Sequence, residues 1–153
     1  MKPEYRNILF CSDFSPGADN AFFTALDLAE RYRARLYLLH VIPEADLFDD
    51  SFGETAPGEP DSSPGAASME KVRQKFEDRY VHRLGGYSNY AVQILRGVPI
   101  VEIVRFARDR EVDVIVMGAA GSSNRNKLHF GSTAENVARR AFCTVMCIRK
   151  PQR

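Results

Sequence analysis

Apolar positions along the chain follow two different spacings. Five short segments are apolar at nearly every position, and between them lie longer segments in which apolar residues recur every three or four positions. A nearly continuous apolar run is typical of a strand buried on both faces of a parallel sheet, whereas the wider spacing is typical of an amphipathic helix. The segments predicted as strands are 8–11, 36–42, 90–95, 112–117 and 143–148.

Residues that start and stop helices lie between the predicted strands. Ser15 followed by Pro16 predicts a capped helix from residue 16. Further helices are predicted from Met69 to the Gly85-Gly86 pair, from Pro99, and over 132–141. The helix from Pro99 is expected to turn these residues inward: Ile100, Ile103, Val104 and Ala107. The helix from Met69 carries basic residues that we expect to form an ordinary exposed face: Arg73, Lys75, Arg79 and Arg83.

The order βαβαβαβαβ predicts an α/β fold. Right-handed crossovers give an open, doubly wound parallel sheet with helices on both faces. A chain of 153 residues suits one domain spanning 1–153. Residues 44–68 hold seven acidic and no basic residues among repeated Pro, Gly and Ser, so we expect a mobile loop there.

Charge and cysteine content narrow the class of partner and the compartment. Twenty-one basic and 20 acidic residues give a net charge of +1, which favours neither a nucleic-acid surface nor a membrane surface. No apolar stretch is long enough for a membrane span. Three cysteines without CxxC spacing predict free thiols, so we expect a cytoplasmic protein.

A group of glycines follows the fourth predicted strand. Gly118, Gly121 and Gly131 have the spacing G-x2-G-x9-G, and Ser132 and Thr133 come next, at the start of a predicted helix. Glycines let backbone N–H groups approach an anion, and a helix start offers N–H groups without intrahelical partners. This pattern is compatible with phosphate binding.

The same residues also have a purely structural interpretation. Ser132 and Glu135 are spaced as a capping box, and Gly118 is compatible with a tight turn. Asp13 follows the first strand, so Asp13 and Gly118 both belong to the sheet edge where ligands of such folds bind, although Asp13 also suits a turn. No Ser-His-Asp order, carboxylate-pair motif or metal-ligand cluster is present, so the sequence offers no catalytic or metal-binding residue.

Four segments together resemble the universal stress protein family. They are ILFCSDFS at 8–15, LHVIPE at 39–44, GVPIVEIVRFARDREVDVIVMG at 97–118, and GAAGSSNRNKLHFGSTAENVARRAFCTVMCIRK at 118–150. The nucleotide-binding members of that family carry G-x2-G-x9-G-[ST], which this chain matches without a gap. Ala119 and Ala120 depart from the Ser-His that is frequent between the first two glycines, which removes polar groups there.

The resemblance implies a Rossmann-like sheet of the order 3-2-1-4-5, with ATP in the crevice between strands 1 and 4. Mg²⁺ could accompany the ATP, bound to its phosphates. Ser12 and Asp13 would then face the adenosine, Val41 the adenine, and Met117 and Gly118 the ribose. The residues implied at the phosphates are Gly121, Gly131, Ser132, Thr133 and Ala134.

The last predicted strand, Cys143 to Ile148, is apolar on both faces and would form an exposed sheet edge. Pairing with the same strand of a second copy would cover it, and the resemblance also implies a homodimer. We therefore expect an ATP-binding, nucleotide-dependent regulatory or stress-response module that acts on an unknown protein partner. A nucleotide-independent interaction module of the same fold and a slow ATPase are the alternatives.

Overall fold

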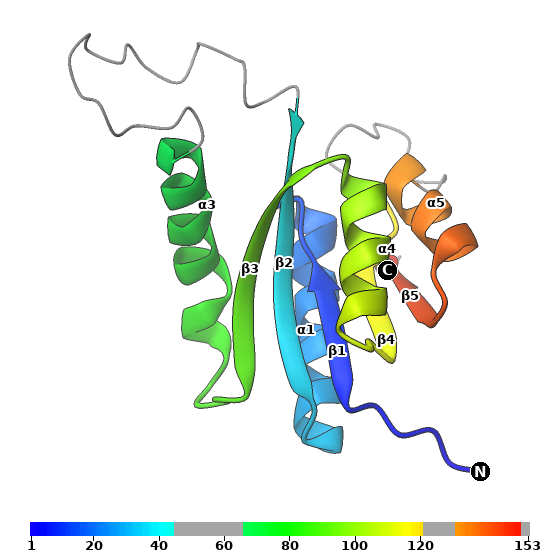
Figure 1. Cartoon of the computed structure of the whole chain (residues 1–153). Coiled ribbons are helices and arrows are strands. Elements are labelled where there is room, and N and C mark those ends of the chain that lie inside the picture. Colours follow the sequence, from blue (N-terminus) through cyan, green and yellow to red (C-terminus); the bar gives the residue numbers. More distant parts are fainter. Residues whose placement is uncertain (45–65, 121–130, 151–153) are drawn as a thin grey trace, which may run out of the picture.

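The computed structural model describes residues 1–44, 66–120 and 131–150. They contain a five-stranded sheet in the order β3-β2-β1-β4-β5, with every neighbouring pair parallel (Figure 1). The strands are β1 (Asn7–Cys11), β2 (Arg35–Pro43), β3 (Tyr90–Gly97), β4 (Val114–Gly118) and β5 (Thr144–Ile148). This arrangement confirms the predicted fold class and strand order.

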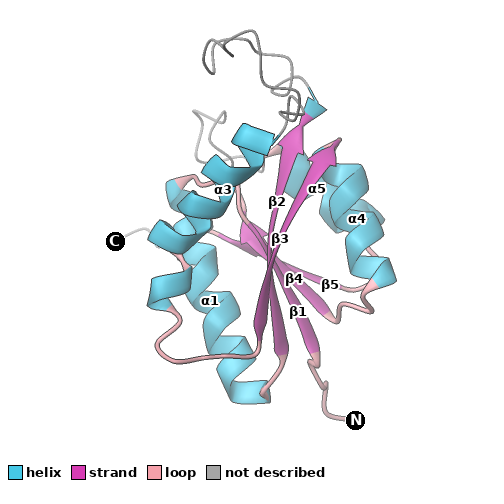
Figure 2. Cartoon of the chain, turned by 60° about the vertical axis from the view of Figure 1, so that its left-hand side comes forward, coloured by secondary structure: helices cyan, strands magenta, loops and turns pink. Residues whose placement is uncertain are grey.

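Helices cover both faces of the sheet, as the doubly wound fold requires. They are α1 (Pro16–Tyr32), α3 (Ala66–Arg79), α4 (Pro99–Asp109) and α5 (Ser132–Arg140), with a short 3₁₀ turn, η2 (Val81–Arg83). α1 and α3 lie on one face, and α4 and α5 on the other (Figure 2). Within the described ranges, no helix is long and apolar enough to cross a membrane.

The two faces of β1 show why its sequence is apolar throughout. Ile8 and Phe10 belong to the core under α1 and α3, and Leu9 and Cys11 to the core under α4 and α5. All four are buried. Successive side chains of a strand point to opposite faces, so a strand covered on both faces needs apolar residues at every position.

The start of α1 matches its prediction. The Ser15 hydroxyl accepts a hydrogen bond from the Ala18 N–H at 3.3 Å, and Pro16 occupies the first turn. α1 ends where Arg33 adopts a left-handed conformation with φ of 52°. The cap fixes the position at which the chain leaves the carboxyl end of β1 and enters the helix.

Two details of the helices differ from the prediction. α3 begins at Ala66, inside the segment expected to be a loop, because Ala66 and Ala67 favour helix and extend it toward its N-terminus; residues 45–65 lie outside the described residues. α4 buries Phe106, which was not among the inward positions, while Ile100 and Val104 are only half-buried. The Phe106 ring packs edge-on against Tyr37, with centroids 5.2 Å apart.

Candidate functional site

The turn after β1 and the two described residues after β4, Ala119 and Ala120, lie at one edge of the sheet. Cys11, the last residue of β1, is in register with Met117, one residue before the end of β4. From β1 the chain continues to β2 on one side, and from β4 to β5 on the other, so the winding reverses between them. Ligands of open α/β sheets bind at such a reversal. Asp13 and Gly118 both fall at this edge.

Asp13 is exposed and shapes the turn after β1. Its carboxylate accepts a hydrogen bond from the Ser15 N–H at 3.0 Å. Ser15 in turn caps α1, so the two side chains hold consecutive parts of the turn. The turn role expected of an aspartate at this position is therefore present, and the exposed carboxylate lies at the edge where a ligand would bind.

The Ser12 side chain points toward α3. Its hydroxyl is buried, lies 2.7 Å from the Tyr80 hydroxyl oxygen, and accepts a hydrogen bond from the Phe14 N–H at 2.9 Å. The Ser12 carbonyl oxygen lies 2.7 Å from Nδ1 of His40. Ser12 therefore fixes the shape of the turn, because its hydroxyl and its carbonyl group are both engaged by the protein.

Val41 and Met117 line the α4/α5 face of the sheet near its carboxyl edge. Both side chains are buried and belong to the same apolar cluster, which also contains Cys11. They offer van der Waals contact and no hydrogen-bonding group.

Gly118 is required by contacts within the protein. A Cβ on Gly118 would lie 2.9 Å from the carbonyl carbon of Gly17, in the first turn of α1. The glycine therefore permits close packing of β4 against α1. The sequence pattern alone could not distinguish this role from the close approach of a ligand. Gly121 lies outside the described residues.

The start of α5 differs from the predicted capping box. Gly131 is the cap residue, and Ser132 is already the first helical residue, so no side chain caps the helix. The Gly131 N–H is bonded to the Ala119 carbonyl at 2.7 Å, and the first helical bond joins Glu135 N–H to Gly131 at 3.0 Å. The three intervening N–H groups, of Ser132, Thr133 and Ala134, have no intrahelical partner. The capping-box interpretation does not hold, because the helix begins at Ser132, one residue earlier than a box with Ser132 as its cap requires.

Two ionisable side chains near this edge, Cys11 and Tyr80, are held in their neutral forms. Burial is the main cause that raises the pKa of the Cys11 thiol and of the Tyr80 hydroxyl. Both therefore remain protonated at neutral pH. Among the described residues, His, Cys, Asp and Glu side chains form no group of three that could hold a metal ion. The described part of the edge thus offers N–H donors, apolar side chains and the exposed Asp13 carboxylate.

Sequence reasoning missed the link between this edge and α3. Arg79 was expected on an exposed charged face, but its guanidinium is half-buried, pairs with Asp19 of α1 and donates to the Phe14 carbonyl. Tyr80 donates to the other oxygen of Asp19 at 2.9 Å. The signal available in the sequence was a tyrosine at an inward position, since a buried Tyr hydroxyl requires a partner.

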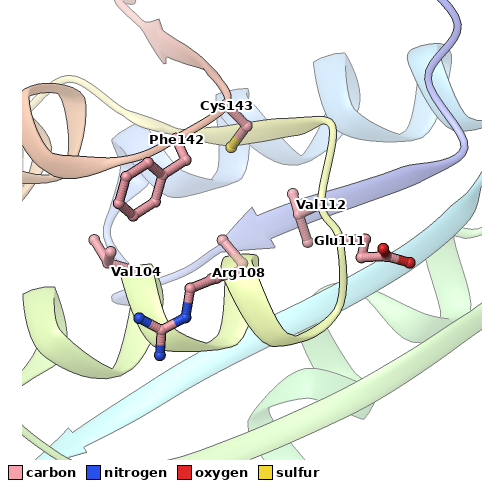
Figure 3. Close-up of a pocket in the computed structure, with 7 residues that line it drawn as sticks. Val104, Arg108, Glu111, Val112, Phe142 and Cys143 are labelled. Atoms are coloured by element: carbon pink, nitrogen blue, oxygen red, sulfur yellow. The ribbon is translucent and has the colours of Figure 1, made fainter.

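A small hollow lies at the opposite, amino edge of β4 and β5 (Figure 3). It has a volume of about 180 Å³ and is lined by Val104, Ala107, Arg108, Glu111, Val112, Phe142 and Cys143. Its position does not coincide with the reversal of winding. The carboxyl edge therefore remains the candidate site on topological grounds.

Comparison with known proteins places the chain in a family. The sequence profile of the universal stress protein family matches residues 4–149. A universal stress protein from Methanocaldococcus jannaschii is 29% identical over 152 residues, which cover 97% of this chain and 85% of that protein. The structure of UspA from Lactobacillus plantarum is similar, with a TM-score of 0.72 and 28% identity over 97% of this chain and all of the other.

A further similar structure carries a ligand. It is the universal stress protein from Archaeoglobus fulgidus in complex with dAMP, with a TM-score of 0.64 and 19% identity over 96% of this chain and all of that one. At this identity the likeness concerns the fold.

Proposed function

The chain belongs to the universal stress protein family, and from this premise we propose that it binds an adenine nucleotide, ATP foremost, at the carboxyl ends of β1 and β4. The observation that carries the proposal is the start of α5, where the N–H groups of Ser132, Thr133 and Ala134 have no side-chain cap. They lie at the edge that also holds the Asp13 turn. Uncapped N–H groups and the positive end of the helix dipole together favour a phosphate.

Each of the predicted residues has a place in this proposal. The N–H groups of 132–134 hold phosphate oxygens, and Gly131 positions them through its bond to Ala119. Val41 and Met117 supply apolar contact to adenine and ribose. The remaining members of the site are Ser12, Asp13, Gly118 and Gly121. Mg²⁺ would be carried on the phosphates. The dAMP bound by the Archaeoglobus fulgidus protein supports an adenine nucleotide.

We infer that the nucleotide acts by shifting a conformation or an interface of a cytoplasmic regulatory module. The described residues of the edge contribute N–H donors, apolar side chains and the Asp13 carboxylate, which is engaged by the Ser15 N–H, so we expect any hydrolysis to be slow. Phosphate release well above background that disappears in Asp13→Ala would instead favour the ATPase alternative.

A homodimer through β5 is part of the proposal. β5 pairs with β4 on one side, and its other edge has no partner strand among the described residues. Four of its five residues are half-buried, on both faces. A partly apolar sheet edge of this kind is stabilised by pairing with a second copy about a two-fold axis.

Titration calorimetry with ATP and Mg²⁺ tests the nucleotide proposal. Ser132→Asp places a carboxylate at the helix start, which suits the helix dipole but repels phosphate. We expect it to weaken binding about tenfold, or ~1.4 kcal/mol, with no loss of thermal stability. Ala138→Asp, on an exposed position of the same helix, is the control and should bind like the parent. The proposal fails if the parent gives no binding heat or if Ser132→Asp binds equally well.

A nucleotide-independent interaction module is favoured by one observation. Gly118 is explained by its contact with Gly17, without any ligand. This alternative would be supported by three results together. Freshly purified protein would release no nucleotide on denaturation, give no binding heat with ATP, and still capture a protein partner.

A further inference from the structure

Two residues at the end of α3 are tied to the turn that follows β1. Arg79 is the last residue of α3 and Tyr80 comes directly after it. We propose that both are positioning residues, which hold the turn 12–15 in the shape that binds the nucleotide and so couple the docking of α3 to nucleotide affinity. The inference rests on the proposed function and adds a means of regulating the same site.

Because each hydroxyl has only one proton, the donor and the acceptor of each of these hydrogen bonds can be assigned. Tyr80 has a single hydroxyl proton, which it donates to the Asp19 carboxylate. The Ser12 hydroxyl must therefore donate to the Tyr80 oxygen, 2.7 Å away, while it accepts from the Phe14 N–H. Burial raises the pKa of the Tyr80 hydroxyl, which keeps the donor protonated.

Arg79 closes this chain of hydrogen bonds into a ring. Its guanidinium donates to the second oxygen of Asp19 and also to the Phe14 carbonyl. The ring thus runs from the Phe14 N–H through Ser12, Tyr80, Asp19 and Arg79 back to the Phe14 carbonyl. Both backbone polar groups of one residue in the turn are fixed by the same set of side chains.

Phe14 needs this restraint because its backbone is strained. Its φ is 60°, in the left-handed region that a bulky residue rarely adopts. Its ring packs against Phe76 of α3, with centroids 5.2 Å apart, and against His40, with centroids 4.8 Å apart. Strained residues persist only when their surroundings over-determine them, and they gather at binding sites.

The neighbours of Phe14 are the residues that matter for the ligand. Asp13 and Ser15 flank it and are joined by the carboxylate to N–H bond of the turn. If α3 loosens, Phe14 relaxes to negative φ and the Asp13 carboxylate moves away from the crevice. Coupling is reciprocal, so a nucleotide that binds the strained turn must stabilise the docking of α3 by the same factor.

Tyr80→Phe tests the inference, because it removes one hydroxyl and keeps the ring in the core. We expect nucleotide affinity to fall about three- to tenfold, the factor that one lost hydrogen bond supports. Tyr87→Phe is the matched control, since the Tyr87 hydroxyl also makes hydrogen bonds within the protein, to the backbone carbonyls of Ala29 and Ala34, away from the turn. Arg79→Met and the exposed Arg73→Met form a second matched pair.

Amide hydrogen exchange without nucleotide separates this inference from the proposed function. Exchange at the Phe14 N–H should speed up in Tyr80→Phe and Arg79→Met, but not in the two controls. In a background that already carries Asp13→Ala, Tyr80→Phe should change nucleotide affinity much less than it does in the parent. If Tyr80 had only a structural role, the effect of Tyr80→Phe would be the same in both backgrounds. A parent that fails to bind nucleotide overturns the proposed function. If the parent binds nucleotide, the positioning role is overturned by either of two results. One is that Phe14 N–H exchange is unchanged in the variants, and the other is that Tyr80→Phe binds nucleotide as tightly as the parent.

Discussion

Gly118 at the end of β4 lies against Gly17 in the first turn of α1, so closely that a Cβ on Gly118 would come within 2.9 Å of the Gly17 carbonyl carbon. Real Cβ atoms do not lie so close to backbone atoms. The backbone of Gly17 cannot relieve the clash by changing rotamer, as a side chain could. The first glycine of the G-x2-G-x9-G pattern is thus needed for the fold before any ligand binds.

Gly118→Ala should therefore destabilise the protein in the absence of nucleotide. We expect the free energy of unfolding in urea to fall by about 1–3 kcal/mol, the usual cost of overpacking. If the glycine served only a ligand, the variant without nucleotide would unfold at the same urea concentration as the parent. For the same reason, lost binding in a Gly118 variant is not evidence of a ligand contact.

Stability should also depend on pH through the buried Cys11 thiol. Burial raises its pKa above the ordinary value of 9.0, so the folded state keeps the proton that the unfolded state loses. The free energy of unfolding is unaffected below pH 9 and falls above it, by up to ~1.4 kcal/mol per pH unit.

Urea unfolding of the parent and Cys11→Ala between pH 8 and 10 measures this contribution. Cys11→Ala should be less stable than the parent at every pH, because it loses buried volume. Above pH 9, however, its free energy of unfolding should fall less steeply with pH than that of the parent. Parallel curves for the two proteins would show that the thiol does not contribute.

Most of the fold could be predicted from the sequence because its apolar pattern reflects burial. β1 is apolar at each buried position, and Ser15 and Pro16 mark the start of α1 within one residue. The start of α3 was placed too late, because a composition rich in Pro, Gly and Ser was extended over Ala66 and Ala67, which favour helix.

The place of the candidate site residues in the fold could be predicted from the sequence, but their contacts could not. Asp13 and the start of α5 lie at the expected edge because parallel strands bring their carboxyl ends together. The ring through Arg79 and Tyr80 joins residues about 60 positions apart in the chain, namely Arg79 to Asp19 and Tyr80 to Asp19. Spacing along one helix cannot reveal such partners, so Arg79 looked like any exposed basic residue.

The free edge of β5 gives a test of the homodimer. The Ile148 carbonyl accepts the Ala119 N–H, so the polar groups of Ile148 point toward β4. Backbone polar groups alternate along a strand, and those of Cys147 therefore point to the free edge.

Cys147→Pro should leave the β4 ladder intact while it removes a donor at the proposed interface. Sedimentation of the parent at micromolar concentration should show a dimer, and Cys147→Pro a folded monomer. Met146→Pro removes a ladder bond and should instead unfold more easily. A monomeric parent, or a Cys147→Pro dimer, would contradict pairing through β5.

The central claim, an adenine nucleotide at the carboxyl ends of β1 and β4, is tested most directly by mapping backbone N–H resonances during titration with ATP and Mg²⁺. The account predicts saturable shifts that are largest at Asp13, Ser132, Thr133 and Ala134, with little change at Cys143 in the hollow of the opposite edge. No saturable shift, or shifts centred on that hollow, would contradict it.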